Sequence, residues 1–335
     1  MTKTETQNFD WADKRVLLTG AGGFIGSHLT EALLSKGATV RALTHYNSRN
    51  DPGFLSPHIP RRRLEIVAGD ICDLDAVRRA AQDTEVIFHL AALVGIPYSY
   101  EHVHQVVEVN TIGTLNVLTA ARENRVQRVV HTSTSEVYGT ARTVPISETH
   151  PKQPQSPYSA SKIAADALAL THHFSFGLPV AICRPFNTYG PRQSDRAVIP
   201  ALIAQALHKE TVTLGNLAPT RDFTFVSDTV NGFIKVAEAE ACIGQEINLG
   251  TGTEISIGDL ARKIITLVGR DVNVKCAEER MRPAASEVQR LCSDNSKARE
   301  LAGWAPVVSL DEGLRATLNW VRRARHLYDP DHYRV

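Results

Sequence analysis

The stretch VLLTGAGGFIGSHLTEALLSKG, residues 16–37, contains the pattern that decides the fold. A short apolar strand runs into a glycine-rich turn, and apolar residues at helical spacing follow the turn. Gly20, Gly23 and Gly26 let the backbone turn tightly, approach a pyrophosphate and pack the helix on the strand. The start of that helix would present free N–H groups to phosphate oxygens. The stretch therefore predicts a nucleotide-binding strand–turn–helix.

The same alternation of strand and helix continues through the first 185 residues. Strands are expected at Val16–Leu18, Val40–Leu43, Leu64–Val67, Val86–Leu90, Val129–Val130 and Val180–Cys183. Helices are expected at Phe24–Lys36, Asp73–Ala81, Val103–Asn124 and Tyr158–Phe176. This alternation predicts an α/β fold with a doubly wound parallel sheet and helices on both faces.

After Pro185 the pattern changes. Helices are expected at Val198–Lys209, Asp228–Ala239, Ile257–Val268 and Leu310–Arg323, with short strands such as Phe223–Val226. Residues 1–185 are therefore interpreted as a dinucleotide-binding domain. Residues 186–335 are interpreted mainly as a smaller mixed α/β lobe that covers the carboxyl ends of the strands. A segment near 228–252 is expected to return to the main sheet, with Glu246–Leu249 as a further strand.

Composition excludes several classes of protein. The chain has 335 residues, a formal net charge of +1 and no long basic stripe, so a nucleic-acid-binding surface is not expected. No signal-type or membrane-spanning apolar stretch is present, and a cytoplasmic protein is expected. The five cysteines have no metal-ligand spacing, so they are interpreted as reduced thiols and no metal site is expected.

The remaining cofactor positions follow the other strands. An acidic residue about twenty positions after the glycines would bind the ribose hydroxyls, but Thr44 and His45 stand at the end of that strand. Arg49 could bind a 2′-phosphate, so NAD and NADP both stay possible. Asp70 could accept from an adenine amino group, and small residues in HLAA allow a close approach. The predicted cofactor-binding residues are Gly20, Gly23, Phe24, Ile25, Gly26, Asn47, Arg49, Asp70, Ile71, Leu90, Ala91, Ala92, Asn110, Tyr158 and Lys162.

A Tyr-x-x-x-Lys pair indicates proton-transfer chemistry. Tyr158 and Lys162 in SPYSASK are four residues apart and share one face of a helix. A tyrosine phenol is a weak base at neutral pH, and a neighbouring ammonium is expected to lower its pKa. Such a pair suits removal of a proton from a hydroxyl while hydride leaves the same carbon.

The motifs TGAGGFIG, HLAA, NTIGTLNVL, STSEVYG, YSASK and RPFNTYGPR occur in the order found in extended short-chain dehydrogenases/reductases. The chain resembles the nucleotide-sugar-modifying branch of that superfamily over essentially its whole length. The resemblance implies catalytic roles for Thr134, Tyr158 and Lys162. It also implies that Asn110 interrupts a helix to order the site, and that a homodimer forms through a four-helix interface.

Within this branch, Glu136 in HTSTSEVYG is the discriminating residue. Sugar 4-epimerases typically lack a glutamate there, whereas 4,6-dehydratases and UDP-glucuronate decarboxylases have one. A 4,6-dehydratase oxidises C4, eliminates water across C5 and C6, and returns the hydride to C6, so Glu136 would remove the C5 proton. Ser135 stands where glucose-type dehydratases have an aspartic acid, as in GDP-mannose dehydratases. Glu136 is therefore expected to serve as base and then as acid.

Three alternatives stay open on the sequence. Thr-Ser-Glu also fits the decarboxylases, although their tyrosine motif typically carries acidic and glycine residues that YSASK lacks. A 4-epimerase is disfavoured by Glu136. A non-catalytic nucleotide-binding protein is disfavoured because Thr134, Glu136, Tyr158 and Lys162 are all intact.

Candidate substrate residues lie in the second half. Arg192, Arg221 and Arg282 could bind the diphosphate of a sugar nucleotide or form surface salt bridges, and Asn187 could donate an amide hydrogen to the same group. GIPYSY together with RPFNTYGPRQSDRAVIP resembles the dehydratases of legionaminic-acid-type pathways, which act on GDP- or UDP-N-acetylglucosamine. The resemblance therefore implies an N-acetylhexosamine nucleotide as substrate.

Overall fold

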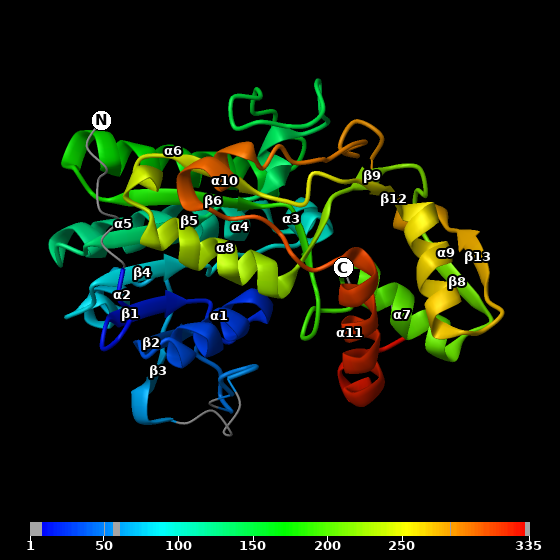
Figure 1. The fold of residues 1–335 in the computed structure, drawn as a ribbon, viewed down its shortest axis with the longest axis horizontal. Helices are drawn as coiled ribbons and strands as arrows, with labels where there is room; N and C mark the ends of the chain where they lie inside the picture. The colour runs from blue at the N-terminus through cyan, green and yellow to red at the C-terminus, as the bar shows by residue number, and fades with distance from the viewer. Residues whose placement is uncertain (1–8, 50, 56–60, 282, 332–335) are drawn as a thin grey trace.

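The computed structural model describes residues 9–49, 51–55, 61–281 and 283–331. A seven-stranded parallel sheet forms its centre, in the order β11-β6-β5-β4-β1-β2-β3 (Figure 1). The strands are β1 Arg15–Thr19, β2 Thr39–Thr44, β3 Leu64–Ala68, β4 Val86–His89, β5 Arg128–Thr132, β6 Val180–Pro185 and β11 Glu246–Leu249. The predicted doubly wound parallel sheet is confirmed.

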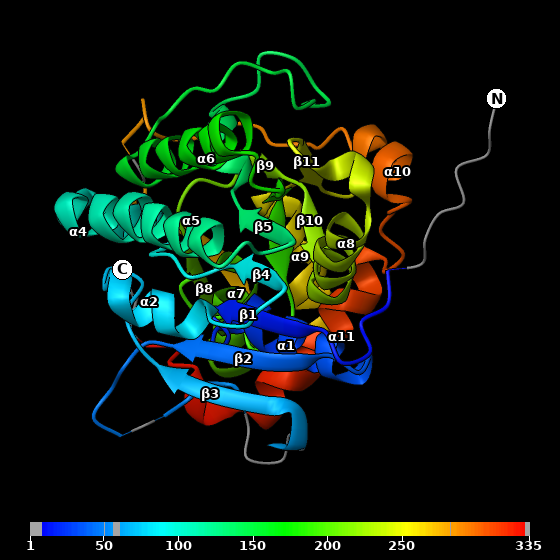
Figure 2. The same ribbon diagram turned by 90° about the vertical axis from the view of Figure 1, so that its left-hand side faces the viewer.

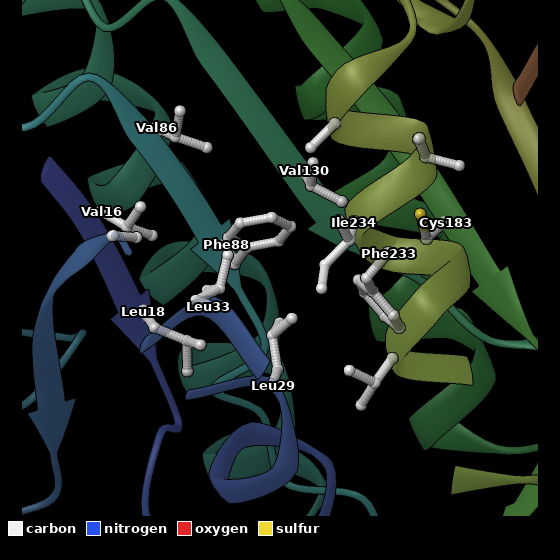
Figure 3. Packing of buried hydrophobic residues seen from close by; sticks show 14 of the residues in the cluster. Val16, Leu18, Leu29, Leu33, Val86, Phe88, Val130, Cys183, Phe233 and Ile234 are labelled. Carbon is white, nitrogen blue, oxygen red and sulfur yellow. The ribbon is translucent and has the colours of Figure 1, made fainter. Parts of the chain in front are cut away.

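Helices cover both faces of this sheet, as Figure 2 shows. One face carries α1 Phe24–Ser35, α8 Val226–Glu238 and α10 Ser296–Ala302; the other carries α2 Leu74–Ala81, α5 Gly113–Glu123 and α6 Pro157–Phe176. On the first face, Leu29 and Leu33 of α1 pack with Phe88, while Phe233 of α8 packs near Val130 (Figure 3). These side chains are fully buried, so apolar area removed from water holds the helices on the sheet.

The start of α6 is defined by local chemistry. Ser156 and Ser159 form a reciprocal capping box, and Pro157 occupies the first helical turn, where its missing N–H costs nothing. Gly177, with φ +68°, ends the helix in the left-handed conformation. The capping box places Tyr158 in the first turn of α6 and Lys162 one turn later.

The segment expected as one helix over Val103–Asn124 is interrupted. It comprises α4 Val103–Val107, a π-helical turn η2 Glu108–Ile112, and α5. A separate helix, α3 Ile96–Glu101, precedes it and was not expected. Periodicity alone predicted one helix because it does not register one extra residue in a turn, whereas the interruption lies at Asn110, where the family resemblance implied one.

The segment expected to return to the sheet forms its last strand. β11 pairs in parallel with β6, and Asn248 lies opposite Arg184. The Asn248 amide accepts from the Tyr138 hydroxyl at 2.8 Å and donates to the Ile146 carbonyl at 3.0 Å. These bonds tie β11 to the segment after β5. The proposed domain boundary at residue 185 stays a prediction.

The smaller lobe packs its helices around a second core. It contains α7 Val198–His208, α9 Ile257–Val268 and α11 Leu310–Arg323, which gather on one side of the sheet in Figure 1. Three two-stranded pairs join them: β7 Asn187–Tyr189 with β10 Phe223–Phe225, β9 Thr220–Arg221 with β12 Ile255–Ser256, and β8 Thr211–Leu214 with β13 Asn273–Cys276. In the described part of the chain, no helix has the length and apolarity needed to cross a membrane.

Candidate functional site

The glycine turn between β1 and α1 brings three backbone segments into contact. Gly20 has φ +71°, and a Cβ there would lie 2.8 Å from the Ala91 nitrogen. A Cβ on Gly26 would lie 2.2 Å from the Gly20 carbonyl oxygen, whereas one on Gly23 would meet that oxygen at 3.3 Å. Gly20 and Gly26 are therefore required by packing, which leaves the start of α1 open to a ligand.

Gly22 is a glycine that the sequence reasoning did not single out. A Cβ there would lie 2.3 Å from the Pro52 carbonyl oxygen. The Phe54 N–H donates to the Gly22 carbonyl at 2.9 Å. The loop after β2 is therefore packed directly on the glycine turn. The second glycine of the run GAGG, residues 20–23, was the available signal.

The predicted adenosine-side residues lie at the ends of β2 and β3. Asp70 accepts from the Cys72 N–H at 2.9 Å, and its other carboxylate oxygen lies 3.6 Å from His45 Nε2. Asn47 accepts from the N–H groups of Arg49 and Asp51, which shapes the loop. Arg49 is exposed.

The strand ends around the glycine turn are tied together by a buried polar chain. The Ala91 N–H donates to Thr19 Oγ1 at 3.1 Å, and Thr19 Oγ1 lies 2.8 Å from His89 Nδ1. His89 Nε2 in turn lies 3.0 Å from Thr114 Oγ1 on α5. Ile71 packs against Gly113, where a Cβ would come within 2.6 Å of the Ile71 side chain. Backbone from β1, β4 and α5 is thus held at one edge of the sheet.

A short 3-10 turn, η3 Ser135–Tyr138, follows β5 and carries Glu136. Thr134 caps this turn, and its hydroxyl accepts from the Glu136 N–H at 3.2 Å. Ser135 is buried, with 3% of its surface exposed, and Glu136 is partly exposed. The capping bond fixes the Thr134 side chain against the backbone of Glu136 within one turn.

Tyr158 and Lys162 are buried on α6, beside η3. Burial raises the pKa of the Tyr158 phenol; the Thr134 hydroxyl opposes this rise, and the charges of Glu136 and Asp166 add to it. Burial is the largest influence on the pKa of Tyr158 here, and Lys162 is not among the groups that shift it, so the expected lowering is not found in the protein chain by itself. Burial lowers the pKa of Lys162 to about 8, and Asp166 opposes that change.

A buried charged cluster behind Lys162 was missed by sequence reasoning. Asp166 lies 2.8 Å from Arg184 Nη2 and 3.3 Å from His131 Nε2, and all three side chains are inaccessible to solvent. Two signals could have found it. Asp166 is four residues after Lys162 on the same helix, and Arg184 interrupts the otherwise apolar strand of AICRPFN.

Asn110 sits in the π-helical turn η2 and bonds to two other elements. Its amide oxygen accepts from the Leu93 N–H at 2.8 Å, and its amide nitrogen donates to the Leu93 carbonyl and to Ser161 Oγ, both at 3.0 Å. These bonds connect the exit of β4 to the helix of Tyr158 and Lys162. The geometry is that of a side chain that orders the surrounding backbone.

The structure separates the predicted substrate residues. Arg192 donates to Ser27 and Glu31 of α1, at 3.1 and 2.7 Å. Arg221 lies 3.3 Å from the Glu287 carboxylate and is mostly buried. Arg192 thus contacts the sheet half, whereas Arg221 pairs within the lobe.

Two further substrate predictions have different outcomes. The Asn187 side-chain oxygen is buried and has no hydrogen-bond partner among the described residues. Arg282 lies outside the described residues.

Two other features bear on the chemistry. A cavity of about 470 Å³ lies between residues 251–255 and Pro306–Leu310, and none of the predicted site residues lines it. No group of three or more His, Cys, Asp or Glu side chains within the described ranges has a metal-binding arrangement. The candidate site is thus described by the glycine turn, η3, α6 and Asn187, without that cavity.

The chain is similar to known proteins over most of its length. The family model described as GDP-mannose 4,6 dehydratase matches residues 17–317. A UDP-glucose 4-epimerase from Mycolicibacterium smegmatis is 36% identical over 92% of this chain and 98% of its own length. The UDP-glucuronic acid decarboxylase 1 of Xenopus tropicalis is 34% identical over 92% of this chain and 72% of its own length.

A solved structure of similar fold comes from a third reaction class. It is a dTDP-glucose 4,6-dehydratase from Streptomyces venezuelae with NAD bound, with a TM-score of 0.84 and 32% identity over 94% of this chain and 99% of that chain. Identity alone therefore does not separate epimerase, decarboxylase and dehydratase. The chain belongs to the GDP-mannose 4,6-dehydratase-type family of extended short-chain dehydrogenases/reductases, and it is an enzyme of the nucleotide-sugar dehydratase and epimerase group.

Proposed function

We propose that this protein is a nucleotide-sugar 4,6-dehydratase that converts an NDP-N-acetylhexosamine into its 4-keto-6-deoxy product, with NAD as cofactor. The observation that carries the proposal is the position of Glu136. Glu136 follows the Thr134 cap on η3, and its carboxylate is close enough to Tyr158 for its charge to raise the pKa of the phenol. An epimerase needs a base only at the C4 hydroxyl, whereas elimination needs a second one at C5.

The residues present fit a dinucleotide. The glycine turn is packed so tightly that side chains at Gly20 and Gly26 would collide with backbone. The turn leads directly into the start of α1, whose free N–H groups suit a phosphate. Gly20, Gly23 and Gly26 would hold the pyrophosphate, Asp70 the adenine, and Lys162 the nicotinamide ribose. When bound, NAD would supply the nicotinamide that accepts the hydride from C4 of the sugar and later returns it to C6 of the same sugar.

The chain's own groups move the protons. Tyr158 would remove the proton of the C4 hydroxyl while Thr134 orients that hydroxyl, and the Lys162 cation would stabilise the phenolate. The C4 ketone would make the C5 hydrogen acidic, and Glu136 would remove it. Glu136 would then return the proton to the departing C6 hydroxyl, which leaves as water. Once the hydride has been returned to C6, C5 would take up a proton that originates from solvent, which completes the 4-keto-6-deoxy product. Ser135 would hold the C6 hydroxyl, since a serine is itself a poor acid.

Residues of the smaller lobe would bind the diphosphate of the sugar nucleotide. Asn187 and Arg221 would contact the diphosphate, together with Arg282, while the contacts of Arg192 with Ser27 and Glu31 support a role between the lobes. Polar donors of this kind fix the position of a phosphate without taking part in the chemistry. The N-acetylhexosamine rests on the likeness of GIPYSY and RPFNTYGPRQSDRAVIP to dehydratases of that specificity.

The proposal includes a cytoplasmic homodimer. Val103, Val107 and Ile112 of the α4–η2 segment are 42, 43 and 45% exposed, and Phe174 and Phe176 near the end of α6 are 75 and 52% exposed. Exposed large apolar side chains on neighbouring helices are typical of a surface that another chain covers.

Mass spectrometry of products formed in heavy water tests the reaction. The protein would be mixed separately with GDP- and UDP-N-acetylglucosamine, dTDP-glucose, GDP-mannose and UDP-glucuronate. Loss of water from an N-acetylhexosamine nucleotide, with deuterium gained at C5, is the expected result. Loss of carbon dioxide from UDP-glucuronate would establish a decarboxylase instead, and a C4 epimer without loss of mass would establish an epimerase.

A substitution then tests the role of Glu136. Glu136→Gln keeps the side-chain volume but removes the base, so we expect dehydration to fall by roughly 10²- to 10⁴-fold. Glu123→Gln is the matched control, because Glu123 lies on α5 in an ion pair with Arg78. Dehydration at a near-normal rate by Glu136→Gln would remove the basis of the proposal.

A further inference from the structure

Lys162 and Asp166 are both buried on α6, and the proposed reaction does not use the Asp166 carboxylate. Asp166 lies one helical turn further along α6, on the same face. Lys162 is 3% exposed and Asp166 is 0% exposed. A carboxylate removed from water in this way is costly unless its partners are fixed around it.

Those partners come from the strands beneath α6. Ser133, directly after β5, donates its hydroxyl to Asp166 at 2.8 Å. Arg184 on β6 donates to the same carboxylate oxygen at 2.8 Å. Arg184 also contacts Glu246 on β11, which pairs with Lys152 at 2.5 Å. Cations and carboxylates thus alternate from Lys152 to Asp166.

The other ionisable groups around Lys162 do not replace the charge of Asp166. Burial lowers the pKa of both His89 and His131, so both rings are neutral near pH 7. The charged and titratable groups around the cluster are His89 on β4, His131 on β5, Glu136 on η3, Tyr158 and Asp166 on α6, Arg184 on β6 and Glu246 on β11. Of these, Asp166 is the group whose charge opposes the effect of burial on the pKa of Lys162.

We propose that Asp166 is a positioning residue whose carboxylate, held by Arg184 and Ser133, keeps the Lys162 side chain a cation beside Tyr158. This inference rests on the proposed function, because the cation is useful only where Tyr158 acts as a base. Without the carboxylate, burial would act on Lys162 unopposed and favour its neutral amine. A neutral amine no longer stabilises the phenolate that removes the C4 hydroxyl proton.

Direct titration of Lys162 tests this idea without substrate. The Nζ resonance would be followed in protein labelled with ¹⁵N-lysine, and Lys162→Met would assign the signal. The wild-type midpoint is expected near pH 8, in line with a pKa of about 8. In Asp166→Asn the midpoint should fall by about one pH unit or more. An unchanged midpoint would overturn the proposal.

Two further variants separate charge from packing. Asp166→Asn leaves Arg184 with one carboxylate fewer and could fail to fold, so Asp166→Asn/Arg184→Gln removes both charges together. The lowered midpoint should persist in that double variant, and its return to the wild-type value would refute a direct effect of Asp166. Ser133→Ala removes only a hydrogen bond, so it should shift the midpoint far less.

The rate profile provides a second readout. The alkaline limb of the kcat profile should move to lower pH in Asp166→Asn by the same amount as the Lys162 midpoint, with KM unchanged. A uniform loss of kcat at all pH values would indicate a structural role and refute the proposal. Because the titration needs no turnover, it decides the role of Asp166 even if the dehydratase activity is not found.

Discussion

The sheet half and the smaller lobe hold their site residues by different means. In the sheet half, Gly20 and Gly26 are fixed by backbone atoms, and Arg184 is enclosed by carboxylates with no solvent contact. In the smaller lobe, Arg221 pairs with Glu287, and Arg192 pairs with Glu31 of α1. Backbone packing and buried pairs leave little freedom, whereas an ion pair can exchange one partner for a phosphate. The comparison suggests that the chemistry is built rigidly and that substrate recognition is adjustable.

Arg184→Met should produce the largest loss of stability. It leaves Asp166 and Glu246 facing an apolar side chain, and removal of one member of a buried pair costs about 3–5 kcal/mol of unfolding free energy. Chemical denaturation near pH 7 measures this loss. A change below about 1 kcal/mol, the range of exposed pairs, would break the contrast between the two halves.

The loss from Arg184→Met should also depend on pH. Arg184 and His131 hold the pKa of Asp166 below its usual range, although burial opposes them. A depressed carboxyl pKa contributes stability above the unfolded-state value near ~4, and this contribution disappears as pH falls through the folded value. The difference between wild type and variant should therefore narrow below about pH 4, as measured by denaturation at several pH values.

Gly26→Ala should have the next largest effect. The added methyl would lie 2.2 Å from the Gly20 carbonyl oxygen, so backbone must move, at a cost of about 1–3 kcal/mol. NAD binding followed by calorimetry should weaken together with thermal stability. Gly23→Ala is the matched control for thermal stability in the same turn, since its methyl would meet that oxygen at 3.3 Å. Equal losses of thermal stability in the two variants would contradict packing as the reason for Gly26.

Arg221→Met should weaken substrate affinity and also lower stability, because the pair of Arg221 with Glu287 is mostly buried. Loss of a charge-assisted contact with the diphosphate should raise KM for the sugar nucleotide about tenfold or more, because such contacts are worth ~1.5–3 kcal/mol. kcat should change little. Steady-state kinetics give both values, and a fall in kcat at constant KM would place Arg221 in the chemistry and not in recognition.

Arg192→Ala should have the smallest effect. It removes the contacts to Ser27 and Glu31, of which Glu31 is partly exposed, and such pairs are worth about 0.2–1 kcal/mol. Thermal unfolding should show a small decrease, with KM nearly constant. A rise in KM as large as that of Arg221→Met would mean that Arg192 gives up its contacts on α1 for the diphosphate.

The parts predicted best from sequence depend on neighbours along the chain. The turn from Gly20 to Gly26, the strands of the sheet and the return of Glu246–Leu249 all follow from periodicity and turn residues. Thr134, Glu136, Tyr158 and Lys162 were found by motif, and the structure brings their two elements together. Their roles stay predictions.

The parts that were missed depend on contacts between distant elements. Asp166 meets Arg184 only because β5 and β6 pair in register beneath α6. The pKa of Tyr158 follows from burial that no spacing of residues encodes. The two- to four-residue strands of the smaller lobe are too short for periodicity to detect, and the helix interruption at Asn110 was expected from the family resemblance alone.

The position of β11 has a consequence for the protein while it is being synthesised. The strand is made well after β6, yet it supplies the edge of the sheet and the Glu246 partner of Arg184. Until the ribosome has released residues 246–249, the edge of β6 stays unpaired and Arg184 lacks one carboxylate. A nascent chain that ends near residue 185 should therefore be a target for chaperones, and the first half should complete its fold only after much of the second has emerged.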